Sequence, residues 1–473
     1  MSIADRLKLA WRVLAGYHMT EWSTRRTTRV DRSQSARKDI PYAVRRKMLD
    51  WSRELERRDP LFNRFLDLNE QYVVGPTGLK LVSASRDSVA AQLMNEAWDG
   101  WTPYCDLSSR FSFGTRQGLI TREFRVAGEV FIYLTYGNTG RPRIQLVESE
   151  RCETPPKLSQ NPNVIDGVQV DSNGRPEAYW FQEDSDTNRQ PTWTAVAADR
   201  IVHLMDPSRI GQMRGLPIVY PVLRDLIDVA ELQELEMLAA KDAASTSKVV
   251  TTADGDLDAE QILRGESTTF SDGHKEYYKQ EIGGETIVLR NGDTYSQFPS
   301  NRPSVAVQSF WDFVSARAAA GLGLPIEILI MRSLQGTTVR GLYDMAHAYF
   351  RCATAVLADP FARIWEHVML NERSVRNRLP GDFRRIRYTP PRSINVDVGY
   401  NSNALINEWR AGFTTLEAIA SARGEEWEQI MDQRAIEIQR SRQIEQDYQL
   451  PPGSVLELSQ PKPSTAIPST TQA

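Results

Sequence analysis

The chain has 473 residues, 41% of them hydrophobic and 25% charged, and a formal net charge of −4 at pH 7. This length can form two to four domains, and the composition is that of an ordinary folded protein, without the basic excess of a nucleic-acid-binding chain. The three cysteines lie far apart in the sequence and do not have the spacing of a zinc site. We therefore expect them to be reduced thiols in a cytosolic compartment. No apolar run approaches the roughly 20 residues of a membrane span, so no membrane partner is expected.

The first 125 residues are predicted to be mainly helical. Residues 1–40 begin with an amphipathic helix, expected on the protein's own surface rather than on a membrane, and continue as a basic, Arg-, Thr- and Ser-rich stretch expected to be mobile. Apolar residues at helical spacing predict two helices between residues 41 and 72. Asp59 suits the N-cap of the second helix and Pro60 its first position.

Residues 126–205 are predicted to be β-rich. Short runs of β-branched and aromatic residues alternate there with Gly, Pro and Asn turns. Residues 171–174, Asp-Ser-Asn-Gly, have the composition of a hairpin turn. His203, inside the apolar run IVHLM, is expected to be a hydrogen-bonded core residue rather than a metal ligand.

A long helix is predicted to begin between residues 217 and 221 and to end near residue 245. At 1.5 Å per residue it would be about 40 Å long, which is unusual in the core of a monomer. Asp228, Glu231 and Glu234 follow one another at intervals of three residues and form an acidic stripe along it.

The rest of the chain is predicted to be helical apart from one β-containing segment. The expected order is strands and turns over residues 247–302, a helix over 303–320, an irregular segment over 326–337, a long helix over 338–371 and a charged helix over 425–448. Pro360 is expected to kink or divide the long helix, and residues 414–417 have the spacing of a capping box. The last two dozen residues are rich in Pro, Ser and Thr and are expected to be disordered.

Catalytic motifs are absent from the sequence. Residues 206–217, DPSRIGQMRGLP, place glycines and arginines ahead of a helix, but they lack the lysine and the spacing of a phosphate-binding loop. Asp254, Asp256 and Asp258 have calcium-loop spacing, but Ala and Gly stand where that loop needs Gly and Glu. We therefore expect no enzyme activity, no cofactor and no metal.

Six stretches occur along the chain in a distinctive order. They are LERRDPLFNRFLDLNEQYVVGPTG, FRVAGEVFIYL, VDSNGRPEAYWF, ADRIVHLMDPSRIGQMRGLPIVYPVLRDL, ARAAAGLGLPIEIL and GFTTLEAIASARGEEWEQIMDQRAIE. Together they resemble the lambda-type portal proteins of tailed bacteriophages, over about residues 45–445. The chain departs from the family pattern at residues 337–340, where a Tyr-Ser-Ser-x-Arg run is usual, and near residues 385–400, where a Trp- and Pro-rich segment is weak.

The resemblance implies an α+β portal fold with a mixed α/β wing, a long α-helical stem, a small β-containing clip and a C-terminal helical crown, assembled as a ring. On this sequence it places a basic N-terminal segment at 1–40, the wing at 41–215, the first stem helix at 216–246, the clip at 247–302, the second stem helix at 303–322, a tunnel loop at 323–338, a long wing helix and a return to the wing at 339–400, the crown at 401–449 and a disordered tail at 450–473. A channel-lining role would account for the unusual length of the first stem helix.

The resemblance also implies a function in the virion. Family members form rings, usually of twelve identical subunits, at one capsid vertex, and double-stranded DNA is packaged and ejected through the ring without sequence preference. Expected partners are further copies of the chain, the terminase large subunit, the major capsid and scaffold proteins and a neck or head-completion protein, with assembly in the host cytoplasm. The alternatives are a head-completion or adaptor ring protein, which is usually smaller, and a nucleic-acid-processing enzyme, which would need motifs that this sequence lacks.

Site residues follow from this placement. The channel candidates are Arg332, Gln335 and Arg340 of the tunnel loop and the acidic stripe of Asp228, Glu231 and Glu234. The loop arginines are expected to contact DNA, with ion pairing between subunits as the alternative. The carboxylates are expected to repel phosphates, so that DNA slides without sticking.

Residues 206–217 are expected to join the wing to the first stem helix. Gly211 and Gly215 would supply backbone freedom there, and Pro217 would begin the helix. Arg209 and Arg214 are expected to contact a neighbouring subunit rather than DNA.

Overall fold

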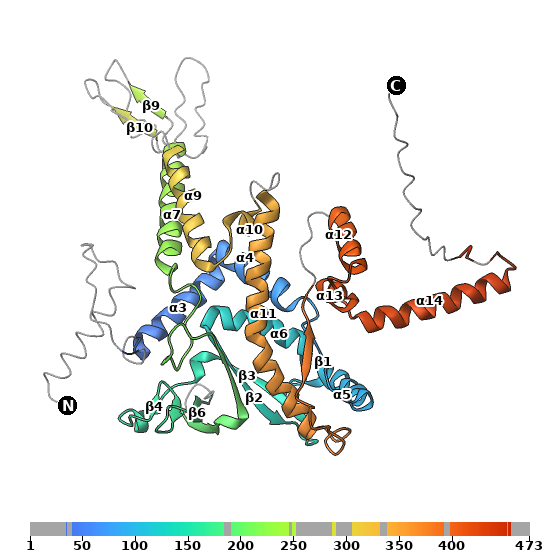
Figure 1. The fold of residues 1–473 in the computed structure, drawn as a ribbon. Helices are drawn as coiled ribbons and strands as arrows, with labels where there is room; N and C mark the ends of the chain where they lie inside the picture. The colour runs from blue at the N-terminus through green and yellow to red at the C-terminus, as the bar shows by residue number, and fades with distance from the viewer. Residues whose placement is uncertain are drawn as a thin grey trace, which may run out of the picture.

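The computed structural model describes residue 35 and residues 40–183, 191–245, 248–251, 286–289, 305–331, 338–391, 398–451 and 453–455. Within these ranges the chain forms a mixed α and β body from which a helical hairpin projects (Figure 1). The C-terminal helices lie to one side of the body, and the last of them extends away from it. The expected N-terminal segment, most of residues 247–302 and most of the C-terminal tail lie outside the described residues.

The body begins with the predicted helix pair. Helix α3 (Tyr42–Arg58) is followed by α4 (Pro60–Asn69), which continues into a π-helical turn, η2 (Glu70–Val74). The carboxylate of Asp59 accepts a hydrogen bond from the backbone N–H of Phe62 at 2.6 Å. This bond satisfies one of the N–H groups that a helix start leaves without a partner, so the N-cap prediction is confirmed.

Loss of this cap has a measurable consequence. Asp59→Ala is expected to lower the free energy of unfolding by about 1 kcal/mol, because the Phe62 N–H loses its acceptor. Thermal unfolding followed by circular dichroism measures the effect. Asp99→Ala, an exposed carboxylate within a helix, is the matched control and is expected to change stability little. Equal losses in the two variants would contradict the capping role.

Two more helices and an edge strand complete the N-terminal part. They are α5 (Ser88–Trp101), α6 (Phe113–Ala127) and β1 (Lys80–Ser83). Strand β1 pairs antiparallel with β11 (Ile386–Thr389), so segments about 300 residues apart share one two-stranded sheet. After α11, the chain therefore returns to its N-terminal part through β11.

The β-rich region forms two antiparallel sheets. The first has the order β3–β2–β8 and the second the order β4–β5–β6–β7. Their strands are β2 (Glu129–Tyr136), β3 (Pro142–Val147), β4 (Val164–Ile165), β5 (Val168–Val170), β6 (Pro176–Gln182), β7 (Trp193–Ala197) and β8 (Ile201–Met205). Short 3-10 turns lie at η3 (Thr102–Tyr104), η4 (Ser149–Arg151), η5 (Pro156–Leu158) and η6 (Ala198–Arg200). The predicted hairpin turn is confirmed, because Gly174 has a φ of 81° and the Asp171 N–H bonds to the Arg175 carbonyl at 2.9 Å.

The projecting hairpin consists of α7 (Leu223–Ser245) and α9 (Val305–Leu322), which lie side by side (Figure 1). At its far end β9 (Lys248–Thr251) pairs in parallel with β10 (Thr286–Leu289). Helix α7 ends where the sequence predicted, but its predicted start is wrong. Residues 217–222 form successive turns instead, with the Tyr220 N–H bonded to the Pro217 carbonyl at 3.0 Å.

A short and a long helix follow the hairpin. Helix α10 (Ile326–Ile330) comes first, and α11 (Thr338–Asn371) then crosses the body. The expectation that Pro360 would divide the long helix is wrong, because α11 continues through it. The hydrogen bond that proline removes is offset by burial of its neighbours Phe361 and Trp365 in the core.

The C-terminal part contains α12 (Val398–Arg410), α13 (Leu416–Ala422) and α14 (Trp427–Asp447). Thr415 caps α13 by accepting from the Ala418 N–H at 3.1 Å. The capping box predicted for residues 414–417 is therefore wrong: the N-cap lies one residue later, and the third helical position is then Ala418, which cannot complete a box. Ion pairs tie these helices to the β1–β11 sheet. They join Lys80 to Glu426 at 3.1 Å and Arg387 to Glu428 at 2.9 Å.

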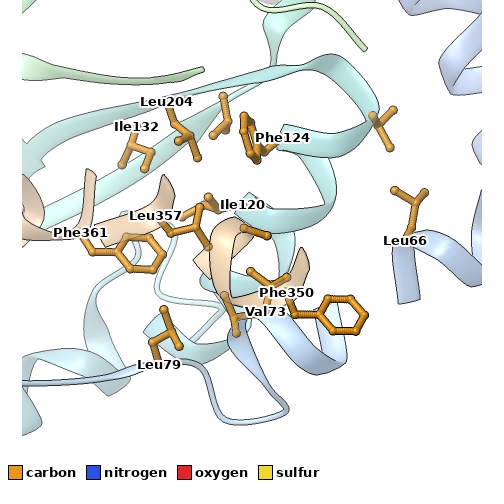
Figure 2. Close-up of a cluster of buried hydrophobic side chains, with 14 of the residues drawn as sticks. Leu66, Val73, Leu79, Ile120, Phe124, Ile132, Leu204, Phe350, Leu357 and Phe361 are labelled. Carbon is orange, nitrogen blue, oxygen red and sulfur yellow. The ribbon is translucent and has the colours of Figure 1, made fainter. Parts of the chain in front are cut away.

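One large apolar core unites elements from most of the chain. Figure 2 shows Leu66 of α4, Val73 of η2 and Ile120 of α6 near Phe350 and Leu357 of α11. Leu226 of α7 and Leu322 of α9 belong to the same cluster, so the base of the hairpin is built into the body. A smaller cluster lies between the two antiparallel sheets and is centred on Phe131.

Candidate functional site

The connection from β8 to α7 makes several buried polar contacts. We call residues 206–222 the joint. Its first part is a surface turn in which the Gln212 N–H bonds to the Arg209 carbonyl at 3.0 Å, and Gly211 is exposed. Its second part passes beneath the start of β2 and is buried at Arg214 and Gly215. The joint therefore lies partly inside the body rather than wholly on its surface.

Gly215 is required for space and not, as expected, for backbone freedom. Its φ lies outside the left-handed region, but a Cβ atom there would lie 2.2 Å from the carbonyl oxygen of Gly128. Gly128 in turn has a φ of 79°, and its Cβ would lie 2.0 Å from the carbonyl oxygen of Leu216. The two glycines let the joint and the end of α6 approach within backbone contact.

Glu129, the first residue of β2, is the centre of a buried ion network. Its side chain is fully buried, and its carboxylate accepts from the Nε of Arg214 at 2.9 Å and from Nη2 of the same guanidinium at 2.6 Å. The backbone N–H of Gly215 donates at 2.7 Å, the Oγ of Ser149 at 2.5 Å, and the Nε2 of His203 lies at 3.0 Å. Every oxygen of the carboxylate is thereby hydrogen-bonded, as a buried charge requires.

Arg214 also binds three backbone carbonyls from two further segments. Its Nη1 donates to the Cys152 carbonyl at 2.8 Å and to the Asp166 carbonyl, and its Nη2 donates to the Ser149 carbonyl at 3.0 Å. Arg45 of α3 completes the set by pairing with Asp166 at 2.5 Å. The joint is thus fixed to β2, to the turn after β3 and to the β4–β5 turn, and through Glu129 and Asp166 it is linked to Arg45 of α3.

The expectation that Arg214 contacts a neighbouring subunit is wrong. Only 5% of the residue is exposed, and its guanidinium binds groups of its own chain. Burial by itself would raise the pKa of Glu129, but the charges of Arg214 and Arg45 and the hydrogen bond from His203 outweigh it and hold that pKa well below its ordinary value. The pair is therefore a buried charged pair at neutral pH.

His203 is a core residue, as the sequence predicted. Its ring stacks on Phe131 at 4.4 Å between centroids, and its Nδ1 lies 3.4 Å from the Tyr179 hydroxyl. The described residues contain no group of three or more His, Cys, Asp or Glu that could hold a metal ion. Burial raises the pKa of the Cys152 thiol to about 12, so this thiol is protonated at neutral pH. The arrangement is suited to holding backbone segments in place, not to catalysis.

The acidic stripe lies on the exposed surface of α7. Asp228, Glu231 and Glu234 are all exposed. Asp225, one turn earlier, is buried and binds Arg317 of α9 with a Nε–Oδ2 distance of 2.8 Å. With about 100° of rotation per residue, the three stripe residues lie about 60°, 120° and 180° around α7 from Asp225.

The tunnel-loop candidates are only partly described. Arg332 and Gln335 lie outside the described residues, whereas Arg340 is exposed in the first turn of α11. The expected irregular segment is shorter than predicted, because α10 occupies residues 326–330. Met331, directly after this helix, has a φ of 55° and ends α10 in the left-handed conformation.

A groove of about 1270 Å³ lies where α3 and α4 meet the base of α7, α9 and α10. Its floor is apolar and includes Trp51, Leu61, Ile227, Trp311 and Leu329. Its charged side chains are Glu54, Arg58, Asp59, Arg64, Glu231, Glu234, Asp312 and Glu327. Two members of the acidic stripe therefore face this groove, and Asp228 does not line it.

Comparison with known sequences decides the family. The family described as "Phage portal protein, lambda family" matches residues 23–338, more than half of the chain. The chain belongs to the lambda family of phage portal proteins. The resemblance seen in the ordered motifs is thereby confirmed. This portal protein is a structural component of the virion and not an enzyme.

Curated relatives carry the same description. The "Probable portal protein" of Halomonas phage phiHAP-1 is 25% identical over 297 residues, which are 59% of this chain and 56% of that protein. "Portal protein B" of Escherichia phage lambda is 24% identical over 378 residues, 70% of this chain and 69% of that protein. The chain thus spans little more than half the length of the Halomonas phage relative.

Solved structures of a gene transfer agent (GTA) contain similar chains. One, from "Virion of native gene transfer agent (GTA) particle", is 12% identical with a TM-score of 0.48 and covers 79% of this chain and 91% of its own. Another, from "Neck of empty GTA particle computed with C6 symmetry", is 12% identical with a TM-score of 0.49 and covers 79% and 93%.

Sequence reasoning about this portal protein missed Glu129, Arg45 and Asp166. One signal pointed to Glu129, because it is the only charged residue in the run VAGEVFIYL. A charge inside an apolar strand is expected to be paired. Its charged partners Arg45 and Arg214, however, lie more than 80 residues away in sequence, and no spacing rule connects them.

Proposed function

We propose that this portal protein forms a ring of about twelve copies at one vertex of the capsid and that double-stranded DNA passes through the ring, without sequence readout, during packaging and ejection. The family match over residues 23–338 carries the proposal. The terminase large subunit docks on the ring during packaging, and a neck or head-completion protein binds it afterwards. Major capsid and scaffold proteins surround it.

The fold suggests how the parts divide. The body from α3 to β8, together with α11 and β11, serves as the wing, and the α7–α9 hairpin serves as the stem. The segment between α7 and α9, which includes β9 and β10, serves as the clip. Helices α12 to α14 serve as the crown. The joint, fixed by the Glu129 network, sets the direction in which the stem leaves the wing.

The exposed apolar surface of the stem in a single copy is evidence in favour of assembly. Its large exposed side chains are Leu235, Met237, Leu238, Phe310 and Phe313. A monomer in water rarely exposes so many large apolar groups on one projecting element, whereas an assembly covers them. Further copies of the same chain are the partners that a ring provides.

The channel surface combines repulsion with a few cations. Asp228, the member of the acidic stripe that does not line the groove, repels phosphates from the stem, so that DNA does not adhere to it. Arg332 and Gln335 of the tunnel loop and Arg340 in the first turn of α11 contact the DNA backbone. Contacts of this kind do not depend on the DNA sequence, as a channel for any packaged DNA requires. They weaken as the salt concentration rises.

The test is the mass and shape of the purified protein. Native mass spectrometry and negative-stain imaging are expected to show closed rings of about twelve copies. Gel filtration at the same concentration supplies the control for nonspecific aggregation, which gives a broad distribution of sizes. A monomer, or a protein that hydrolyses ATP or cleaves DNA, would overturn the proposal.

A further inference from the structure

The stem has two opposite faces, and only one of them belongs to the groove. Trp311, Asp312 and Ser315 of α9 line the groove. Phe310 and Phe313 do not line it, and they are 57% and 66% exposed. A helix turns about 100° per residue. Phe310 therefore lies about 200° around α9 from Asp312, and Phe313 lies about 200° from Ser315. The phenylalanines therefore form an aromatic ridge on the far side of α9.

The ridge and the groove lie at the same level along the stem. Their residues alternate within positions 310–315, a span of about 8 Å along a helix axis. In a ring, each copy is generated from the previous one by rotation, so every residue keeps its height along the axis. Two faces meet in a head-to-tail ring only if they lie at matching levels on opposite sides of the subunit. The ridge and the groove satisfy both conditions.

The charges of the two faces are complementary. Six carboxylates and two arginines line the groove. On the ridge side, Arg317 follows Phe313 by one helical turn, and its side chain is 61% exposed. This cation beside the ridge would meet carboxylates beside the groove, which favours this orientation over the reverse one.

The groove also contains a polar group without a partner. The indole Nε1 of Trp311 is buried and has no hydrogen-bond acceptor among the described residues. Buried N–H groups are nearly always bonded in a completed structure. A chain segment seated in the groove would supply the acceptor.

We propose that Phe310 and Phe313 of one copy insert into the groove of the next copy, between its α7 and its α3–α4 pair. This inference rests on the proposed ring and specifies the contact that closes it. The apolar groove floor receives the two aromatic rings, and Arg317 approaches the carboxylates of Glu231 and Glu234. Each copy then contributes its ridge to one neighbour and its groove to the other.

The first test removes the ridge. Phe310→Ser combined with Phe313→Ser is expected to lower the fraction of protein in rings by about tenfold or more at a fixed concentration, as loss of buried aromatic anchors does. Circular dichroism verifies that the variant folds. The matched control is Phe413→Ser, which replaces a phenylalanine of the C-terminal part that is 86% exposed. This variant is expected to leave the rings intact.

The second test places one cysteine on each face. In a Cys352→Ser background, which removes the exposed native thiol, Leu61→Cys with Phe313→Cys is expected to form disulfides between copies on oxidation. Denaturing gels without reductant would show a ladder of cross-linked copies. Each cysteine alone is expected to give none, because equivalent positions do not meet head to tail.

The outcomes separate this inference from the proposed function. Wild-type protein that forms no ring overturns the portal ring itself. Wild-type rings that persist in the double serine variant, without cross-linking in the cysteine pair, overturn only the ridge-in-groove contact. Loss of rings with cross-linking of the pair supports it.

Discussion

Arg214→Met is expected to lower the free energy of unfolding by about 3–5 kcal/mol, the range for removal of one partner from a buried ion pair. The fully buried Glu129 would lose its guanidinium bonds at 2.9 and 2.6 Å and would have to stay charged without them or take up a proton. Methionine fills most of the same space, so the loss is electrostatic rather than a cavity effect. Three backbone carbonyls would also lose their donor.

Thermal and denaturant unfolding at one protein concentration measure this effect, since assembly makes stability depend on concentration. The matched control is Arg384→Met. Arg384 also binds one glutamate twice, at 2.9 and 2.6 Å, but in an exposed position, so its loss is expected to change stability little. Equal destabilisation of the two variants would show that the buried network contributes nothing beyond a surface ion pair.

The same network gives stability a defined dependence on pH. The pKa of Glu129 is depressed in the folded chain, so its contribution is complete above the ordinary glutamate pKa of about 4.3 and is lost as pH falls from there toward the folded value. Glu129→Gln is expected to be less stable at pH 7 and to lose less additional stability on acidification. A variant that keeps the full acid dependence of the wild type would contradict this assignment.

Arg332→Ala and Gln335→Ala are expected to lower the yield of DNA-filled capsids several-fold while rings assemble normally. Each proposed phosphate contact adds a sequence-independent increment that holds or guides the DNA in the channel. Arg340→Ala is expected to have a smaller effect, because Arg340 belongs to the first turn of α11 and not to the loop. Nuclease-protected DNA per capsid measures packaging, and negative-stain imaging measures assembly.

Arg351→Ala is the matched control for the loop variants. Arg351 is an exposed arginine of the same helix, 11 residues beyond Arg340 and therefore about 16 Å along the axis. It is expected to leave packaging unchanged. Normal filling in the loop variants would remove the case for DNA contact. Loss of rings in those variants would favour the alternative, that the arginines form ion pairs between subunits.

Local interactions explain which elements were predictable. The N-cap at Asp59 depends on a residue three positions away, and the hairpin turn at residues 171–174 depends on its own four residues. The end of α7 near residue 245 also followed from its own helical pattern. Where the controlling interactions are this close in sequence, residue types and spacing suffice to identify them.

The wrong predictions share a different cause. Pro360 does not divide α11, because core packing around Phe361 and Trp365 outweighs the lost hydrogen bond. The joint looked like a surface turn rich in glycine and arginine, yet Arg214 is buried. In both cases the deciding contacts come from segments far away in the chain.

The sequence by itself determined the family, because the order of short motifs is a property of the chain and needs no coordinates. It also determined most helices and strands, since their hydrophobic periodicity is local. Only the tertiary structure decided the role of residues 206–217. It brings Gly215 against Gly128 and Arg214 against Glu129, 85 residues apart, and so makes the joint a buried anchor for the stem rather than an exposed binding site. Spacing along a chain cannot show such a contact, because the free energy that selects it comes from burial and ion pairing between distant segments.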